Sequence, residues 1–262
     1  MNIISIDLPW NPDKKGHRAL AVADLDGNVK IAQAGDDNEL LELIRGNTEP
    51  ESLVLLDVPI DGCGNLDSKH FRSVDKALAR QGIPILPTSK AKDRGKVLKE
   101  RIKNINQGKR VTVQEIYPYA IYKFLAYLKE WGLLQRLGVG KFDTLLDDGF
   151  RIYRPPKYKR ERKRGERRDN MEYLYSLLTD SSLGLRFLTP LPYPNDLSNP
   201  DKLSDKYDAC LGAIVGMYSA SNSRYACVAG DSKSGNMLLL ADRWLVERLG
   251  REVPVGKLRE GV

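Results

Sequence analysis

Two aspartates stand at the ends of apolar runs, where an ionisable side chain can do chemistry. Asp7 follows the apolar run 3–6, Asp57 follows the run 53–56, and each precedes a proline by two residues. A carboxylate beside a buried strand must be paired or bound to a metal, because desolvation of an unpaired charge is costly. Ligands of open α/β sheets bind at the carboxyl ends of strands. We therefore expect both aspartates to lie at a polar site.

A helix predicted at about 203–220 supplies two further acids. Asp205 and Asp208 are three residues apart and share one helix face. That face continues through small residues, which allow a close approach to the sheet: Ala209, Gly212, Ala213, Gly216 and Ala220. Glu115, at the end of a predicted strand, is a further candidate. Each acid taken alone is explained as readily by capping of a turn or helix, and periodicity does not prove that they converge.

A convergent carboxylate cluster is the kind of site that phosphodiester cleavage requires, because it can hold two divalent ions roughly 3.5–4 Å apart. The chain has only two histidines, and its three cysteines form no Cys-x-x-Cys motif. These counts argue against a metal held by imidazole and against a structural zinc site. Oxygen ligands favour Mg²⁺ or Mn²⁺.

Positive charge is concentrated in two segments of a chain whose net charge is +7. Residues 157–168 carry net +6 and residues 89–110 carry net +7, so the remainder is acidic. Two interpretations stay open: solvated helix faces, or a footprint for nucleic-acid phosphates. The second makes these residues candidates for nucleic-acid binding: Lys157, Lys159, Arg160, Arg162, Lys163, Arg164, Arg167 and Arg168.

Three other side chains have an ambiguous role. Arg72 can contact phosphate with two parallel hydrogen bonds, or pair internally with Asp75 three residues on. Tyr153 and Tyr158 flank the basic segment 157–168 and are weak candidates for stacking on bases.

The elements that must position these residues form an α/β pattern. Apolar runs predict strands at 2–8, 18–24, 29–33, 53–58, 83–86 and 111–116, and a terminal hairpin at 225–229 and 236–240. Asp26-Gly27 marks a hairpin between the second and third strands. Helices are expected at 37–45, 71–81, 90–107 and 119–134. The order predicts a mixed sheet, with three antiparallel strands and then parallel ones, and helices on both faces. We expect one domain over 1–262 with a basic helical insertion at about 135–180.

Several stretches together resemble domain-of-unknown-function family 429, whose members are predicted ribonuclease-H-like nucleases distantly similar to Holliday-junction resolvases. They are IISIDLPW (3–10), LLDVPIDG (55–62), FRSVDKAL (71–78), VQEIYPYA (113–120), DKYDACLGAIVG (205–216) and CVAGDSKSGNMLLL (227–240). The resemblance implies a ribonuclease-H-like fold, with Asp7, Asp57 and Asp208 as metal ligands. It makes Glu115 and Asp205 supporting acids, and Arg72 and Asp75 match the family's Arg-x-x-Asp pattern.

The leading hypothesis is a Mg²⁺- or Mn²⁺-dependent nuclease acting on DNA or RNA. In it Asp7 and Asp57 bind the first metal ion and Asp208 shares the second. Glu115 or Asp205 aids the positioning of metal or water at this catalytic site. One alternative is a nucleic-acid-binding module without catalysis. Another is an ATPase or sugar-kinase-like protein, which the lack of a glycine-rich loop after Asp7 disfavours. No apolar run approaches the roughly 20 residues of a membrane span, and the N-terminus does not resemble a signal peptide. We therefore expect a cytoplasmic protein with no membrane partner, and the pattern leaves its oligomeric state open.

Overall fold

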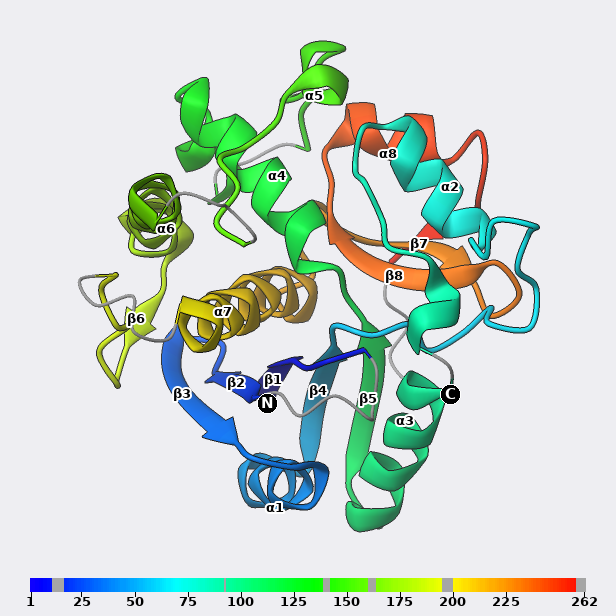
Figure 1. The fold of residues 1–262 in the computed structure, drawn as a ribbon, viewed down its shortest axis with the longest axis vertical. Coiled ribbons are helices and arrows are strands. Elements are labelled where there is room, and N and C mark those ends of the chain that lie inside the picture. The colour runs from blue at the N-terminus through cyan, green and yellow to red at the C-terminus, as the bar shows by residue number, and fades with distance from the viewer. Residues whose placement is uncertain (11–16, 92, 139–141, 160–163, 195–199, 258–262) are drawn as a thin grey trace.

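A six-stranded mixed sheet forms the centre of the fold in a computed structural model, which describes residues 1–10, 17–91, 93–138, 142–159, 164–194 and 200–257 (Figure 1). Its order is β5-β4-β1-β2-β3-β6. The strands are β1 (Asn2–Asp7), β2 (Arg18–Ala23), β3 (Asn28–Ala34), β4 (Glu51–Leu56), β5 (Arg110–Glu115) and β6 (Arg186–Phe187). β1, β2 and β3 pair antiparallel, whereas β4 and β5 run parallel to β1. The predicted α/β class and mixed sheet are confirmed, and the arrangement is compatible with a ribonuclease-H-like fold.

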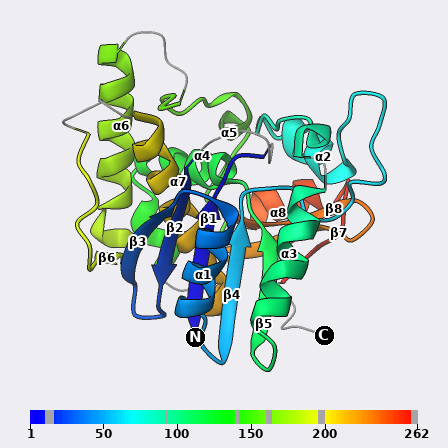
Figure 2. The same ribbon diagram turned by 60° about the horizontal axis from the view of Figure 1, so that its bottom comes forward.

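Helices cover both faces of this sheet (Figures 1 and 2). α1 (Asp37–Asn47) and α3 (Arg94–Ile105) lie on one face, and α4 (Pro118–Glu130) and α7 (Pro200–Ala220) lie on the other. Because strand side chains alternate between faces, β1 contributes to two separate cores. Ile4 and Ile6 join the core with the α1 and α3 side chains, and Ile3 joins the core with those of α7.

A smaller sheet of order β8-β7-β9 lies beside α2 (Ser73–Arg80) and α8 (Arg243–Leu249). Its strands are β7 (Ala226–Asp231), β8 (Gly235–Leu240) and β9 (Val255–Gly256), so the terminal hairpin is confirmed. The predicted insertion region contains α5 (Gly149–Ile152) and α6 (Arg164–Leu178). Short 3₁₀ turns lie at Thr88–Ala91, Leu134–Gly138 and Ser181–Leu183. Among the described residues, no helix has both the length and the apolar character needed to cross a membrane.

The strand predicted at 83–86 is wrong, because this segment is irregular. Pro84 lies within the segment and Pro87 follows it, and proline cannot donate to a strand ladder. The carbonyl of Pro84 instead accepts a hydrogen bond of 2.7 Å from the hydroxyl of Tyr117.

Two glycines let α7 lie against the sheet. A Cβ atom on Gly212 would lie 2.0 Å from Ser5 Oγ and 2.4 Å from Ile116 Cδ1. One on Gly216 would lie 2.4 Å from Ile3 Cγ2. The predicted stripe of small residues therefore faces β1. This close contact sets the distance from the sheet of Asp208, which lies one turn earlier on the same helix.

We predict that Gly212→Ala lowers the free energy of unfolding by about 1–3 kcal/mol, because the new methyl group overpacks the contact with Ser5. Gly46→Ala in α1 is the control, since its Cβ would meet nothing within 4 Å. That change should stabilise the protein by up to about 1 kcal/mol. Urea unfolding of both variants tests this, and equal stability of the two would contradict it.

Candidate functional site

Asp7 and Asp57 lie side by side at the carboxyl ends of adjacent parallel strands. Ile6 pairs with Leu56 in the β1–β4 register, and the backbone N–H of Asp57 donates to the carbonyl of Ile6 at 3.0 Å. Ile3 and Leu53 point to the α7 face, so the period of two places both aspartates on that face as well. The sheet therefore presents these two carboxylates toward α7.

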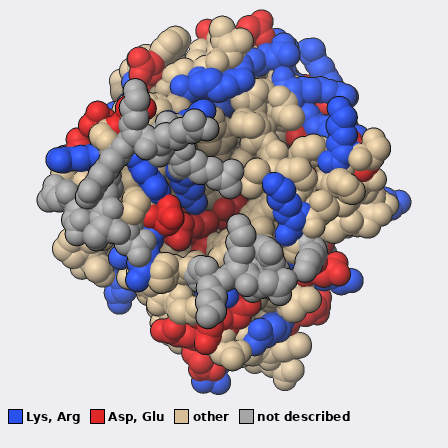
Figure 3. Space-filling model, viewed as in Figure 1, with Lys and Arg blue, Asp and Glu red and all other residues tan. Residues whose placement is uncertain are grey.

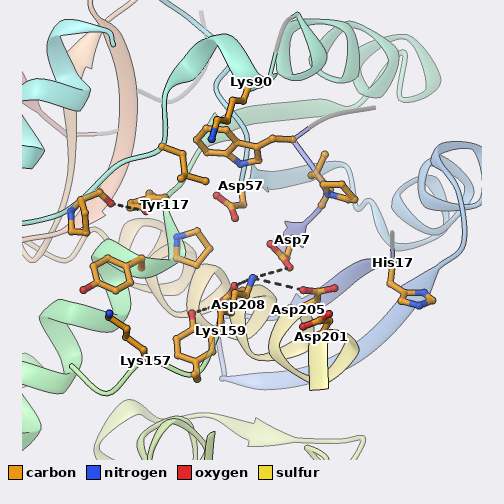
Figure 4. A pocket seen from close by; sticks show the side chains of 18 of the residues that line it. Asp7, His17, Asp57, Lys90, Tyr117, Lys157, Lys159, Asp201, Asp205 and Asp208 are labelled. Atoms are coloured by element: carbon orange, nitrogen blue, oxygen red, sulfur yellow. Dashed lines mark hydrogen bonds and ion pairs between the residues drawn. The ribbon is translucent and has the colours of Figure 1, made fainter. Parts of the chain in front are cut away.

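α7 brings Asp208 and Asp205 to the same place, and a lysine lies between the acids (Figure 4). The Nζ atom of Lys159 forms an ion pair with Asp208 Oδ2. The same atom lies 3.7 Å from Asp7 Oδ2 and 3.7 Å from Asp205 Oδ1. The four predicted aspartates thus converge, but around a side chain that we expected to bind nucleic acid.

Tyr158 holds the other oxygen of Asp208. Its hydroxyl donates to Asp208 Oδ1, and its ring packs edge-on against Tyr122 with centroids 5.1 Å apart. Burial, and then the charge of Asp208, raise the pKa of the Tyr158 hydroxyl well above its usual value. The stacking role considered for Tyr158 is wrong, because the side chain is buried. Tyr153 also packs internally, with its ring centroid 5.4 Å from that of Tyr127.

Crowding and burial make the charges of this cluster interdependent. Burial raises the pKa of Asp7 well above its ordinary value, with Asp208 and Asp57 adding to the effect and Lys159 opposing it. Burial and the charge of Asp208 raise the pKa of Asp57 to about 7. Burial opposes the charged form of Lys159, but the carboxylates around it outweigh this and raise its pKa. A cation bound nearby would stabilise the charged forms of these carboxylates.

The cluster forms the floor of a pocket of about 980 Å³. Figure 3 shows acidic side chains at the bottom of a hollow on this face, with basic side chains around it. Apolar and aromatic residues make up much of the lining: Leu8, Pro9, Trp10, Pro84, Leu86, Tyr117, Pro118 and Tyr119. Lys90, Lys157 and His17 also line it. The aromatic lining was missed from sequence, because no local pattern brings Trp10 and the tyrosines Tyr117 and Tyr119 to one pocket.

Glu115 does not join the aspartates, and its predicted catalytic role is wrong. It pairs with Leu56, whose side chain packs in the core with α1 and α3, so Glu115 faces away from Asp57. Both of its carboxylate oxygens accept from the Arg72 guanidinium, at 2.6 and 2.7 Å. The backbone N–H of Ile60 donates to it as well, at 2.9 Å.

Arg72 is a buried structural residue, so its prediction as a nucleic-acid contact is wrong. Its side chain is 1% exposed. Besides Glu115 it contacts Asp75 through two hydrogen bonds of 2.8 and 3.0 Å, and Thr88 donates to Asp75 at 2.7 Å. Of the two roles considered for Arg72, the internal pair with Asp75 is the one observed. Together with Glu115, this pair links α2 to β5.

The segment 157–168 contributes unequally to the site. Lys157 is exposed and lines the pocket, whereas Lys159 lies among the aspartates. Arg167 pairs with Asp201 at 2.6 Å, and Arg168 pairs with Glu172 at 3.0 Å, so both are engaged within the protein. Arg160, Arg162 and Lys163 lie outside the described residues, as does the side chain of Arg164.

The second basic segment, 89–110, mostly lies away from the pocket. Lys90 lines it. Arg94 is buried against Asp37 at 2.9 Å, Lys99 lies 3.5 Å from Asp61, and Arg110 pairs with Glu51 at 3.0 Å. These three residues are therefore engaged within the protein, although Arg94 is buried and Arg110 lies on β5, so neither lies on a solvated helix face.

The donor chemistry fits one divalent cation better than two. Asp57 Oδ1 is buried without a hydrogen-bond partner in the part of the chain that the structure describes, which is unfavourable unless a cation binds it. Both oxygens of Asp208 are engaged, by Tyr158 and Lys159. No three Asp, Glu, His or Cys side chains among the described residues are arranged as a ready metal-binding group. The Lys159 ammonium pairs with Asp208 and lies 3.7 Å from Asp7 Oδ2, so it occupies the space near both carboxylates.

Comparison with protein-family models, with curated proteins and with solved structures finds no match to this chain. The resemblance to family 429 therefore stays a prediction.

We predict that Arg72→Met lowers the free energy of unfolding by about 3–5 kcal/mol, because Asp75 and Glu115 would remain buried without a counter-charge. The control is Arg45→Met, which removes an exposed pair with Glu42 and should cost less than about 1 kcal/mol. Denaturant unfolding measures both. A similar loss in the two variants would show that the buried cluster has no special structural role.

Proposed function

We propose that the protein hydrolyses phosphodiester bonds of a nucleic acid at the Asp7–Asp57 site, with Mg²⁺ or Mn²⁺ as cofactor. One observation carries the proposal: within the described part of the chain, a buried oxygen of Asp57 has no hydrogen-bond partner, and it lies in an acidic cluster at the floor of a pocket with basic and aromatic walls. Membership of family 429 belongs to the same proposal, supported by the stretches around Asp7, Asp57 and Asp208.

Asp7 and Asp57 would hold the ion from adjacent strand ends. When bound, it would supply Lewis-acid activation of water and neutralise charge on the phosphate. Asp205, on the pocket side of Lys159, would orient that lysine. The rigid sheet keeps Asp7 and Asp57 in register through the hydrogen bond from Asp57 to Ile6, so the site needs little rearrangement to bind a cation.

The pocket walls suggest how a nucleic acid would enter. A phosphate approaching an acidic floor is repelled unless cations offset the charge, and Lys90 and Lys157 line the pocket with Lys159. The aromatic side chains of Trp10 and Tyr117 offer flat surfaces in the same pocket. Bases stack on such surfaces only when they are unpaired. A single strand, or a strand with an exposed base, therefore fits the pocket better than a regular duplex.

We predict that Asp7→Asn and Asp57→Asn each reduce Mg²⁺-dependent cleavage on the order of 10³-fold, which corresponds to the loss of about 4 kcal/mol of transition-state stabilisation. The measurement is the cleavage rate of labelled single-stranded and duplex DNA and RNA. Asp26→Asn is the matched control, because Asp26 is exposed in a hairpin turn that Asn-Gly also forms.

Equal activity of wild type and both site variants would refute the assignment. Binding of nucleic acid with no cleavage of any form, unaffected by EDTA, would favour the non-catalytic binding module instead.

We predict that Trp10→Ala weakens binding of a single strand by about 5- to 150-fold, the equivalent of about 1–3 kcal/mol for one stacked base. Fluorescence anisotropy in the Asp57→Asn background avoids cleavage during the titration. Trp131→Ala is the control, since Trp131 is 53% exposed and its ring stacks on Tyr127 instead. Unchanged single-strand affinity in the Trp10 variant would exclude base stacking at this wall.

A further inference from the structure

We propose that Lys159 is a built-in cation that takes the second cation position of the acidic cluster, so that the site binds a single divalent ion at Asp7 and Asp57. The inference rests on the proposed function for its chemistry, but it concerns the binding of metal and can be tested without nucleic acid.

The partners of the carboxylates divide the cluster into a filled half and an open half. In the filled half, Asp208 accepts from Tyr158 at one oxygen and pairs with Lys159 at the other. In the open half, Asp57 Oδ1 is buried and has no hydrogen-bond partner among the described residues. Asp7 lies between the halves, 3.7 Å from the lysine Nζ and beside Asp57. Asp57 is therefore the carboxylate left open to a bound cation, whereas Asp208 already has one in Lys159.

Like charges keep a second ion away from Asp208. A divalent ion on this carboxylate would lie next to the ammonium of Lys159, and their repulsion is strong where little water screens it. The carboxylates that face the ammonium are shielded from water, since the side chains of Asp208 and Asp7 are 4% and 7% exposed, whereas the Lys159 side chain is 39% exposed on its way into the cluster. The lysine and a second metal ion are thus alternatives at this position.

The two residues before Lys159 are anchored, which helps to hold the lysine in place. The carbonyl of Tyr158 accepts from Arg167 at 3.2 Å, and the carbonyl of Lys157 accepts from Asn170 at 2.8 Å. The Tyr158 hydroxyl is fixed on Asp208. Holding these neighbours lowers the entropy that the lysine side chain loses when its ammonium enters the cluster.

An ammonium and a metal ion differ in one respect that matters for hydrolysis. Lys159 offers positive charge and three hydrogen-bond donors, but no open coordination position for water. Activation of water therefore belongs to the Asp7–Asp57 half, while Lys159 offsets negative charge on Asp208 and Asp205 and can donate to a phosphate oxygen.

The test counts bound Mn²⁺ on the full chain, by isothermal titration calorimetry and by electron paramagnetic resonance of free Mn²⁺. Wild type should bind one ion per chain and Lys159→Met two. Lys159→Arg, which keeps the charge, should bind one. Lys157→Met removes an exposed lysine from the same pocket and should also bind one.

Thermal unfolding gives a second readout, which covers the case that Lys159→Met is poorly stable without metal. Mn²⁺ should raise the Tm of this variant more than that of wild type, because the ions then neutralise carboxylates that the lysine no longer pairs. Two ions bound to wild type, an unchanged count in Lys159→Met, or no Mn²⁺ binding by either protein would overturn the inference.

The outcomes separate this inference from the proposed function. The expected Mn²⁺ counts without cleavage of any nucleic acid would leave Lys159 as the built-in cation and remove the nuclease assignment. Cleavage that depends on Asp7 and Asp57 in a wild-type protein with two bound ions would support the nuclease assignment and remove the role of Lys159 as the built-in cation.

Discussion

The backbone of α7 runs so close to β1 that glycine is required at two contact points, and the position of Asp208 depends on this approach. A larger residue at Gly212 would collide with Ser5, two residues before Asp7 on the same face of the strand. Tight packing therefore does more than fill the core, because it sets the separation between the carboxylate of the helix and those of the strand ends. Interiors this dense deform little, so the site inherits the rigidity of the sheet.

Carboxylates that lie close together and are buried repel one another and lose hydration, so other groups of the site must balance their charge. Burial raises the pKa of Asp7 and Asp57, which means that their charged forms are disfavoured until a cation arrives. Lys159 balances part of that charge, through its ion pair with Asp208. Asp57 Oδ1, for which the described residues offer no hydrogen-bond partner, marks the charge that is not yet balanced.

A second acidic group shows the opposite solution in the same fold. Asp75 and Glu115 are more buried than the site aspartates, but Arg72 and neighbouring donors satisfy them fully. That cluster joins α2 to β5 and has no unpaired oxygen. Burial of an acidic side chain therefore does not by itself show whether its role in this protein is structural or functional. The difference lies in the unpartnered oxygen and in the pocket that opens over Asp57.

The sequence by itself determined the features with a local period: the strand ends at Asp7 and Asp57, the helix face that carries Asp205 and Asp208, and the mixed α/β class. Tertiary structure decided the rest. The β4–β5 register turned Glu115 away from Asp57, since strand parity in one strand says nothing about its neighbour. Tyr158 and Lys159 reach Asp208 across about 50 residues of chain, and no local pattern encodes such a meeting, because only packing of the whole chain brings the two segments together.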